Sequence, residues 1–394
     1  MKFNLKNYIR IGEAALRRNV PVYAHFGTTH RCNLTCKMCG IWRYGNAKEE
    51  LSVAEIEQVA QKMRRMGVAQ VSLGGGEPFA RDDIEEVVGC FLKENLNVRV
   101  LTNGIGIPPK RIDRLIDAGL YNFSISLDSL YPARFDYICE YEGAWDQAVQ
   151  TMVQIGQKVH GKKGALPTIN CVVSNLNLEE LPDIVRFARE IGFAVSFLPI
   201  ELLEDTSAGV QNWEARFIRY RPEMEVHSKD GGSQVEERVD RAYEQLIKMK
   251  KQGWPILNST PYLRSSQEYL KTGHFPTEGC DAGRLYFSVS PNGQYTICHR
   301  TKHQYTNFLD PNFEEFFASG AYEKTRLLES GSCEGCMRAC WIDTSAMFRT
   351  IEGFFETAQL SLRPKKYEKP TWERARKWAR LDDIAIVPNL TDAK

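Results

Sequence analysis

The sequence predicts an α/β protein built on a parallel sheet, followed by a smaller cysteine-rich unit. From Pro21 onward, short apolar runs alternate six times with longer amphipathic stretches. This rhythm is typical of parallel strands joined by right-handed crossovers, in a barrel or an open sheet. Nearer the carboxyl end, two alternating runs flank Pro291-Asn292-Gly293, a strong turn sequence that predicts a β-hairpin.

The expected elements follow one another regularly through the first half of the chain. We expect strands at 21–28, 69–73, 96–102, 121–127, 168–174 and 193–199. We expect helices at 53–66, 82–93, 108–118, 143–159 and 178–190. In such a fold the carboxyl ends of the strands carry the chemistry, because the loops after them meet at one edge of the sheet.

The remaining segments are less regular. Residues 4–18 are amphipathic and predict a surface helix, and a further helix is expected at 236–252. The basic stretch 365–394 predicts a helix docked on the barrel, which we favour over contact with a partner or a membrane. We expect five units: an amino-terminal helix (1–20), a barrel (21–200), a bridge that shapes the substrate pocket (201–279), a unit that binds the auxiliary cluster (280–345) and a helical tail (346–394).

Composition limits the functional classes. The chain has 394 residues, of which 51 are basic and 50 acidic, so its net charge is +1 and no bulk attraction to nucleic acid is expected. The sequence has no apolar run of about 18 residues and no signal peptide, which predicts a cytoplasmic protein. Eleven cysteines in that compartment are expected to be metal ligands, catalytic groups or core residues rather than disulfides.

Three cysteines, Cys32, Cys36 and Cys39, lie within eight residues directly after the first expected strand. Their separations allow at most about 14 Å and about 10 Å, so the segment can curl round one inorganic centre. Thiolates select zinc, copper(I) or iron–sulfur, and a closed structural site normally has four ligands. Two alternatives follow. In one, His30 or a distant thiol is the fourth ligand of a zinc site. In the other, one metal keeps an open coordination position, at which it binds and activates a further molecule.

Polar groups and glycines mark the ends of the following strands. Gly75 and Gly76 let a ligand approach the backbone, and Glu77 offers a carboxylate to a cation such as an ammonium group. Side chains alternate between the two faces of a strand, so Ser126 and Asp128 lie on the same face of the fourth strand. Burying these polar groups without partners would be costly, and the hydroxyls of a ribose would supply their hydrogen bonds.

The Cys-x3-Cys-x2-Cys motif, the Gly-Gly-Glu-Pro sequence after the second strand and the Ser-Leu-Asp strand together resemble the radical S-adenosylmethionine (SAM) superfamily, over about residues 20–200. The resemblance implies a partial (β/α)6 TIM-like barrel. It also implies a [4Fe–4S] cluster on Cys32, Cys36 and Cys39, whose fourth iron is chelated by SAM. Reduction of the cluster would cleave the sulfonium and give a 5′-deoxyadenosyl radical.

The resemblance also assigns SAM binding to groups near the carboxyl ends of the strands: Met38, Gly75, Gly76, Glu77, Asn103, Ser126, Asp128 and Asn170. The Gly75–Glu77 stretch would hold the methionyl amine, while Ser126 and Asp128 would meet the ribose. Met38 departs from the family, which usually has an aromatic residue before the last cysteine. The contact on the adenine side therefore stays open.

A second group of thiols, Cys280, Cys298, Cys333, Cys336 and Cys340, gives a strong metal signal. It resembles the SPASM/twitch extension of radical SAM enzymes, although the full two-cluster version has more cysteines. We therefore expect one auxiliary [4Fe–4S] cluster on Cys280, Cys298, Cys333 and either Cys336 or Cys340. A zinc ribbon is the alternative, because spacing does not distinguish the two metals.

The remaining cysteines are isolated. Cys90 and Cys171 are expected in the core. Cys139 lies after the Ser-Leu-Asp strand, near the place where a substrate radical would form. Its thiol is a candidate hydrogen-atom donor, and simple packing is the alternative.

These observations predict a radical SAM enzyme of open reaction type: oxidoreductase, lyase or epimerase. A flavodoxin- or ferredoxin-type protein would supply the electron, and the auxiliary cluster would assist oxidation or anchor the substrate. We see no leader-peptide-binding domain at either end, which favours a small-molecule substrate such as a sugar, nucleoside or lipid precursor. The alternatives are a maturase that cross-links or epimerises a ribosomally made peptide, and a zinc-binding scaffold without catalysis.

Overall fold

The computed structural model describes most of the chain, and the structural statements below concern these residues: 20–44, 50–200, 231–273, 275, 280–298, 305–333, 335–350, 356 and 368–380. The helix expected at 4–18, the first part of the bridge (201–230) and much of the tail lie outside them. The side chain of Cys340 lies outside them as well.

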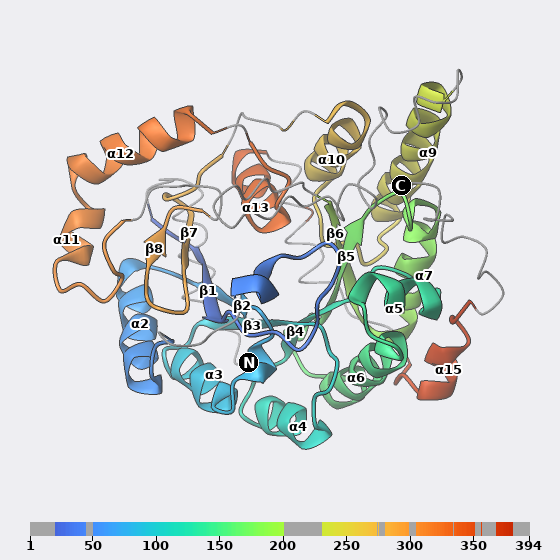
Figure 1. The fold of residues 1–394 in the computed structure, drawn as a ribbon, viewed down its shortest axis with the longest axis horizontal. Helices are drawn as coiled ribbons and strands as arrows, with labels where there is room; N and C mark the ends of the chain where they lie inside the picture. Colours follow the sequence, from blue (N-terminus) through green and yellow to red (C-terminus); the bar gives the residue numbers. More distant parts are fainter. Residues whose placement is uncertain are drawn as a thin grey trace.

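Six parallel strands lie side by side in chain order and form the centre of the molecule (Figure 1). Their bounds are β1 Tyr23–Thr29, β2 Gln70–Gly75, β3 Asn97–Thr102, β4 Asn122–Ser126, β5 Thr168–Val173 and β6 Ala194–Pro199. Each strand pairs in parallel with the next. The predicted alternation and the partial barrel are confirmed.

Helices cover the outside of this sheet. The helices of the barrel are α2 Val53–Met66, α3 Ile84–Lys93, α4 Pro109–Asp117, α5 Pro132–Cys139, α6 Ala144–Val159 and α7 Leu181–Ile191. Three short 3-10 helices lie among them: η1 Ile41–Tyr44, η2 Pro78–Ala80 and η3 Leu178–Glu180. Helix α5 is not expected from the sequence, which leaves this segment as a loop, and it places Cys139 at a helix end.

The second half is mostly helical. Its helices are α9 Gly231–Lys251, α10 Thr260–Thr272, α11 Phe313–Phe317, α12 Gly320–Gly331, α13 Ala339–Arg349 and α15 Trp372–Arg376. Helix α9 confirms the helix expected at 236–252 and begins earlier. Among the described residues, no helix combines the length and the apolar character needed to cross a bilayer.

The predicted hairpin is present as β7 Tyr286–Val289 and β8 Tyr295–Thr296, which flank a turn where Gly293 has φ +82°. Strand β7 also pairs in parallel with β1, and this pairing is not expected from the sequence. The sheet order is therefore β6-β5-β4-β3-β2-β1-β7-β8. The segment that follows Cys280 thus extends the barrel sheet at the β1 edge.

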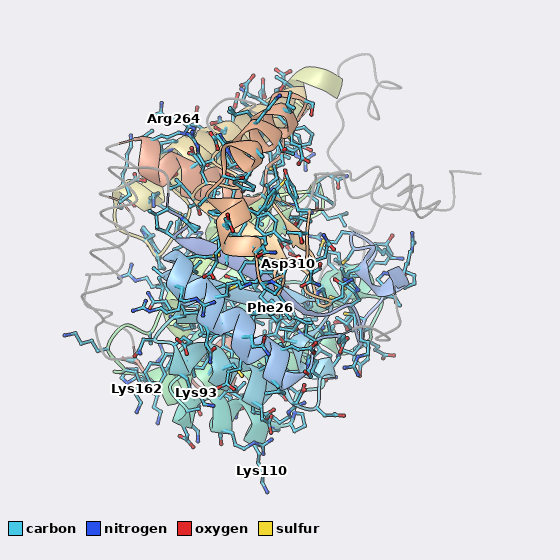
Figure 2. The ribbon with its side chains drawn as sticks, turned by 90° about the vertical axis from the view of Figure 1, so that its left-hand side faces the viewer. Phe26, Lys93, Lys110, Lys162, Arg264 and Asp310 are labelled. Atoms are coloured by element: carbon cyan, nitrogen blue, oxygen red, sulfur yellow. The ribbon has the colours of Figure 1, made fainter. Side chains whose placement is uncertain are left out.

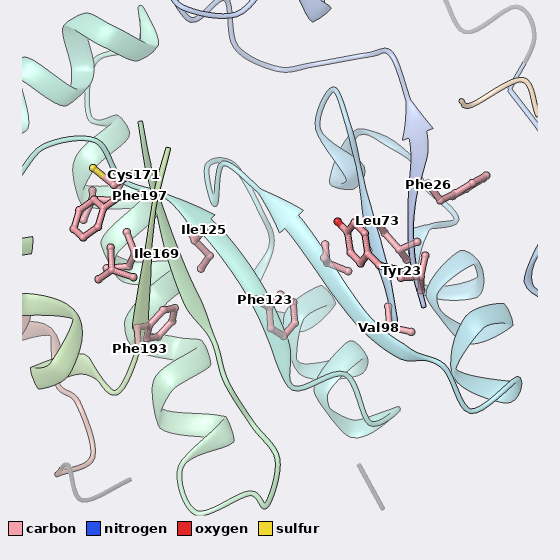
Figure 3. Close-up of a cluster of buried hydrophobic side chains, with 14 of the residues drawn as sticks. Tyr23, Phe26, Leu73, Val98, Phe123, Ile125, Ile169, Cys171, Phe193 and Phe197 are labelled. Carbon is pink, nitrogen blue, oxygen red and sulfur yellow. The ribbon is translucent and has the colours of Figure 1, made fainter. Parts of the chain in front are cut away.

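The two faces of the sheet differ in chemistry. The outer face is apolar and packs under the helices, as Figure 3 shows for Phe26, Leu73, Phe123, Ile169 and Phe197, all of which are buried. Burial of one such side chain contributes about 1.5–3 kcal/mol. The inner face carries polar groups on successive strands: His25, Ser72, Arg99, Ser124, Ser126, Thr168, Asn170 and Ser196. This polar face lines the inside of the open barrel.

The described part of the tail docks on the barrel, as expected. The rings of Trp372 and Trp145 are 6.5 Å apart, and Trp378 Nε1 donates to Glu190 Oε2 at 2.9 Å. In Figure 2, Lys110 of α4 points outward at the end of the molecule opposite Arg264 of α10.

Candidate active site

The three clustered cysteines lie on the loop that follows β1. A backbone hydrogen bond from Cys39 N to Cys36 O, 3.0 Å long, closes a turn between two of them. Burial raises the pKa of the Cys32 thiol to about 11; the charges of Glu77, Cys36 and Cys39 add to this, while a bond from the Leu34 backbone opposes it. The thiols therefore lie in one another's electrostatic field, and a cationic centre there would favour their thiolate forms.

The loop is fixed to the end of β3. Asn33 Nδ2 donates to the carbonyl oxygen of Ile105 at 3.0 Å, and Asn103 Nδ2 donates to Asn33 Oδ1 at 2.8 Å. The Asn103 side chain is thus engaged with the cysteine loop. Within the described residues, no three His, Cys, Asp or Glu side chains converge as the ligands of a single metal ion do.

The glycines after β2 allow two chain segments to touch. A Cβ on Gly76 would lie 2.0 Å from the carbonyl oxygen of Arg31, and one on Gly75, where φ is +120°, would lie 2.3 Å from that of Thr29. Gly76 N donates to Thr29 O at 2.7 Å, and Glu77 N donates to Arg31 O at 2.8 Å. The glycines therefore hold the end of β2 against the chain that leads into Cys32.

Glu77 is 2% exposed, and its carboxylate already has protein partners. Oε1 accepts from Thr102 Oγ1 at 2.8 Å and from Phe79 N at 3.1 Å, and Oε2 accepts from Asn103 N at 2.8 Å. Burial raises the pKa of Glu77 to about 7 even though these bonds oppose the shift. The side chain ties the end of β2 to the end of β3, and its contact with the SAM amine stays a prediction.

A polar patch lies at the ends of β4 and β5. Ser126 and Asn170 are opposite each other in the strand register and partly exposed on the inner face. Asp128 Oδ1 accepts from Val172 N at 2.7 Å, whereas Oδ2 is buried and has no hydrogen-bond partner in the described part of the chain. Burial raises the pKa of Asp128 to about 7. A buried carboxylate oxygen of this kind is satisfied by a ligand hydroxyl or by water.

Two inner-face side chains, Arg99 and His25, escape the sequence analysis. Arg99 Nη1 donates to Ser124 Oγ at 3.1 Å and to Thr168 Oγ1 at 2.7 Å, so both hydroxyls have a partner within the protein. Burial lowers the pKa of His25 to about 4, with a further contribution from the charge of Arg338. The period-2 position of His25 on β1, seven residues before Cys32, is the signal that points to it.

Cys139 lies against the cysteine loop. Its side chain is 4% exposed, and the carbonyl oxygen of the preceding residue, Ile138, accepts from Lys37 N of that loop at 3.0 Å. The predicted role as a hydrogen-atom donor stays a prediction. Met38, assigned to the adenine side, packs against Ile138, Leu176 and Ile200.

Two of the carboxyl-terminal thiols, Cys280 and Cys333, have contacts that the structure describes. Cys280 Sγ lies 3.3 Å from the hydroxyl of Tyr286. Burial raises the pKa of Tyr286, and the charges of Cys280 and Cys336 raise it further. Gly335 N donates to Cys333 Sγ at 3.3 Å, which forms a tight turn inside the Cys-x2-Cys pair. Cys298 follows β8, and the set of auxiliary ligands stays a prediction.

Residues 27–188 match the family model of the radical SAM superfamily. The chain carries a radical SAM domain. Members of this superfamily are enzymes, and their domain binds a [4Fe–4S] cluster and SAM, as predicted. The family match spans β1 to α7 and so contains the cysteine loop, Glu77 and Asp128.

The chain is also similar to proteins with known names. The chain is 33% identical over 187 residues to the mitochondrial GTP 3′,8-cyclase of Arabidopsis thaliana, a stretch that covers 45% of this chain and 45% of that protein. It is 27% identical over 277 residues to the PqqA peptide cyclase of Rhizobium meliloti, covering 69% and 65%. The chain therefore spans less than half the length of the Arabidopsis relative.

Solved structures share the fold. Streptococcus suis SuiB bound to S-adenosylmethionine superimposes with a TM-score of 0.56 at 14% identity, covering 81% of this chain and 69% of that one. The anSMEcpe protein with bound AdoMet gives a TM-score of 0.55 at 13% identity, covering 88% and 99%. The likeness extends beyond the radical SAM domain into the second half of the chain.

Proposed function

We propose that the protein cleaves SAM reductively and abstracts a hydrogen atom from a substrate bound over the polar inner face of the barrel. One observation carries the proposal: the cysteine loop, the Gly75–Glu77 stretch and the buried oxygen of Asp128 meet at the carboxyl edge of one parallel sheet. Their chemistry matches two parts of the reaction centre, namely a thiolate set and a hydroxyl acceptor, while the Gly75–Glu77 stretch fixes the cysteine loop to the sheet.

The residues fit the expected groups. Cys32, Cys36 and Cys39 would hold three irons of a [4Fe–4S] cluster and leave one iron for SAM. The unpartnered oxygen of Asp128 matches a ribose hydroxyl, with Ser126 and Asn170 as neighbours. The bound cluster supplies the electron that breaks SAM, which gives the 5′-deoxyadenosyl radical that takes a hydrogen atom from the substrate.

The protein's own side chains would prepare this chemistry. The Glu77 carboxylate fixes β2 to β3, and Asn103 ties β3 to the cysteine loop through Asn33, so the three strand ends form one rigid unit. Burial raises the pKa of Asp128 and so favours its neutral form. A ligand hydroxyl that donates to the free oxygen would oppose this shift and favour the ionised carboxylate. A neutral His25 and the cationic Arg99 would add polar contacts to the substrate from the inner face.

The substrate class has two candidates. The small-molecule class, expected from the sequence, is supported by similarity to the GTP 3′,8-cyclase. The peptide class is supported by the PqqA peptide cyclase relatives and by fold neighbours solved with the precursor peptide SuiA and the Cp18Cys peptide. We consider the peptide class at least as well supported, because these peptide-related matches cover more of the chain.

The second thiol group is proposed to hold one auxiliary [4Fe–4S] cluster. Two observations support it: the Cys280 thiol lies 3.3 Å from the Tyr286 hydroxyl, and a tight turn follows Cys333. A flavodoxin- or ferredoxin-type protein is proposed as the electron donor, and the cytoplasm as the compartment.

Anaerobic purification tests the proposal. We expect a brown protein with about 7–8 irons per chain that forms 5′-deoxyadenosine from SAM after reduction with dithionite. A colourless protein that carries zinc would contradict the proposal and support the scaffold alternative. Candidate peptides and small molecules are then compared by the extra 5′-deoxyadenosine that each one elicits.

A further inference from the structure

An arginine side chain crosses the inner face of the sheet below the candidate active site. Arg99 is on β3, which lies beside β4 and then β5 (Figure 1). Its Nη1 donates to Ser124 Oγ on β4 at 3.1 Å and to Thr168 Oγ1 on β5 at 2.7 Å. Ser124 is opposite Leu101 in the strand register, two residues nearer the carboxyl end than Arg99. The Arg99 side chain is therefore directed toward the strand ends, where the candidate active site lies.

The guanidinium lies deeper in the barrel than the groups that are expected to meet SAM. Ser124 and Thr168 are opposite each other in the register, and Ser126 and Asn170 form the next pair on the same face. A parallel strand rises about 3.3 Å per residue, so the two pairs are about 7 Å apart along the strands. A ligand group at Arg99 would lie below the ribose that is expected at Ser126.

The Arg99 guanidinium has no counter-ion in the part of the chain that the structure describes. Both of its hydrogen-bond acceptors are neutral hydroxyls. Three other arginines with buried side chains each have a carboxylate partner: Arg81 with Asp83, Arg134 with Glu180 and Arg326 with Glu323. Because a charge enclosed in protein without a partner is costly, the unpaired guanidinium inside the barrel indicates a place for an anion.

The free donors of Arg99 form a fork. A guanidinium has five N–H donors, and Nη1 uses its two on the hydroxyls. Nε and Nη2 have no partner among the described residues, and neither atom is fully enclosed, since Arg99 is partly exposed on the inner face. Two adjacent N–H groups of this kind match two oxygens of a carboxylate or a phosphate. Burial lowers the pKa of Arg99 to about 10, so the side chain is still a cation at neutral pH.

The inner-face neighbours of Arg99 are uncharged. In the strand register Arg99 is opposite Ser72 of β2, and Ser72 is opposite His25 of β1. Burial lowers the pKa of His25 to about 4, so the imidazole is neutral at pH 7. The acidic groups of the site, Glu77 and Asp128, come after the ends of β2 and β4. An anion at Arg99 would therefore meet one cation and no carboxylate from this row of strand positions.

We propose that Arg99 binds an anionic group of the substrate, a carboxylate or a phosphate, through its Nε and Nη2 atoms. The anion would hold one end of the substrate deep in the barrel, while the carbon that loses the hydrogen atom lies nearer Ser126, about 7 Å or more away along the strands. Arg99 thus selects substrates that carry an anion at this separation from the reacting carbon. The inference rests on the proposed function for the reaction, but binding of the anion does not depend on the cluster.

Thermal unfolding of the full-length protein, as purified anaerobically and without SAM, tests the anion site. Inorganic phosphate and acetate are the two probes, each titrated at constant ionic strength. An anion that binds the folded protein raises its unfolding temperature. We expect a saturable rise for the wild type, and Arg99→Gln should weaken the apparent affinity by about 10- to 100-fold, because hydrogen bonds to a charged group are lost. A tighter response to phosphate indicates a phosphorylated substrate, and a tighter response to acetate indicates a carboxylate.

Two more variants sharpen the test. Arg111→Gln is the matched control, because Arg111 is also a partly buried arginine but pairs with Glu85 at 2.8 Å on helices outside the sheet. Its response to the probes should equal that of the wild type. Arg99→Lys keeps the charge and loses the fork, so its affinity should lie between those of the wild type and Arg99→Gln. If Arg99→Gln does not fold, Arg99→Lys decides the question, and an affinity equal to that of the wild type would overturn the proposal.

The outcomes separate the two proposals. If neither probe raises the unfolding temperature of the wild type, or if Arg99→Gln responds to both probes as the wild type does, the anion site is overturned, whether or not the protein cleaves SAM. If the wild type shows the response that depends on Arg99 but forms no 5′-deoxyadenosine from SAM after reduction, the proposed function fails and anion binding by Arg99 is supported without it.

Discussion

Replacing Gly76 by alanine tests how the end of β2 supports the cysteine loop. The new Cβ would lie 2.0 Å from the carbonyl oxygen of Arg31 and 2.9 Å from that of His30. Both are backbone atoms, so no side chain can rotate away. Restoring an ordinary contact requires the chain before Cys32 to move by about 1 Å or more.

The cost follows from two contributions. The movement disrupts the 2.8 Å hydrogen bond from Glu77 N to Arg31 O, which is worth about 1 kcal/mol. Overpacking adds about 1–3 kcal/mol. We therefore expect Gly76→Ala to lower the free energy of unfolding by about 2–4 kcal/mol, and to reduce the iron bound at Cys32 because its loop is displaced.

Urea unfolding of the cluster-free protein under anaerobic, reducing conditions measures the first effect, and iron analysis after reconstitution measures the second. Gly89→Ala is the control: it lies inside α3, nothing lies within 4 Å of its added Cβ, and it should raise stability by about 0.5–1 kcal/mol. If Gly76→Ala unfolds at the same urea concentration as the wild type and binds the same iron, the steric argument is wrong.

Three further predictions concern other parts of the molecule. Because the pKa of Asp128 is raised in the folded protein, the free energy of unfolding should fall as pH rises from about 4 to about 7. Asp128→Asn should remove up to roughly 4 kcal/mol of this fall. If the free energy of unfolding in urea changes with pH equally in the variant and the wild type, the prediction is wrong. Iron analysis should show that Cys32→Ala loses about four irons and keeps the carboxyl-terminal cluster, whereas Cys333→Ala loses about four irons and keeps the SAM-binding cluster. If each variant loses all of its iron, the two groups of cysteines form one shared site. Trp378→Ala removes the bond to Glu190 and should cost about 1–3 kcal/mol, measured by thermal unfolding, whereas an unchanged Tm would argue against docking.

Local periodicity was sufficient for most of the barrel. The strands around Phe26, Leu73 and Ile169 are predicted because their apolar runs are short, regular and bounded by turn residues. Helix α5 was missed because it has only eight residues, begins at a proline and has no long apolar stripe. The left-handed Glu140 at its end depends on a tertiary contact that no local pattern encodes.

The sequence predicted which residues form the candidate site, but it did not predict most of their contacts. Spacing and residue type pointed to Glu77 and Asp128, but the strand-end hydrogen bonds of Glu77 and the free oxygen of Asp128 depend on how separate strands meet. The partners of Arg99 and Lys37 come from segments 25 to 103 residues away in the sequence. Such pairings are decided by packing across the sheet.

The parallel pairing of β7 with β1 has a consequence for how this chain can be divided. A polypeptide that ended before Cys280 would leave β1 as an edge strand, with the backbone groups of Tyr23–Phe26 open along the side that β7 covers. Exposed strand edges recruit other chains, so such a fragment should self-associate. Exchange of carboxyl-terminal segments between proteins of this kind would have to preserve a strand that completes the sheet as well as the thiols.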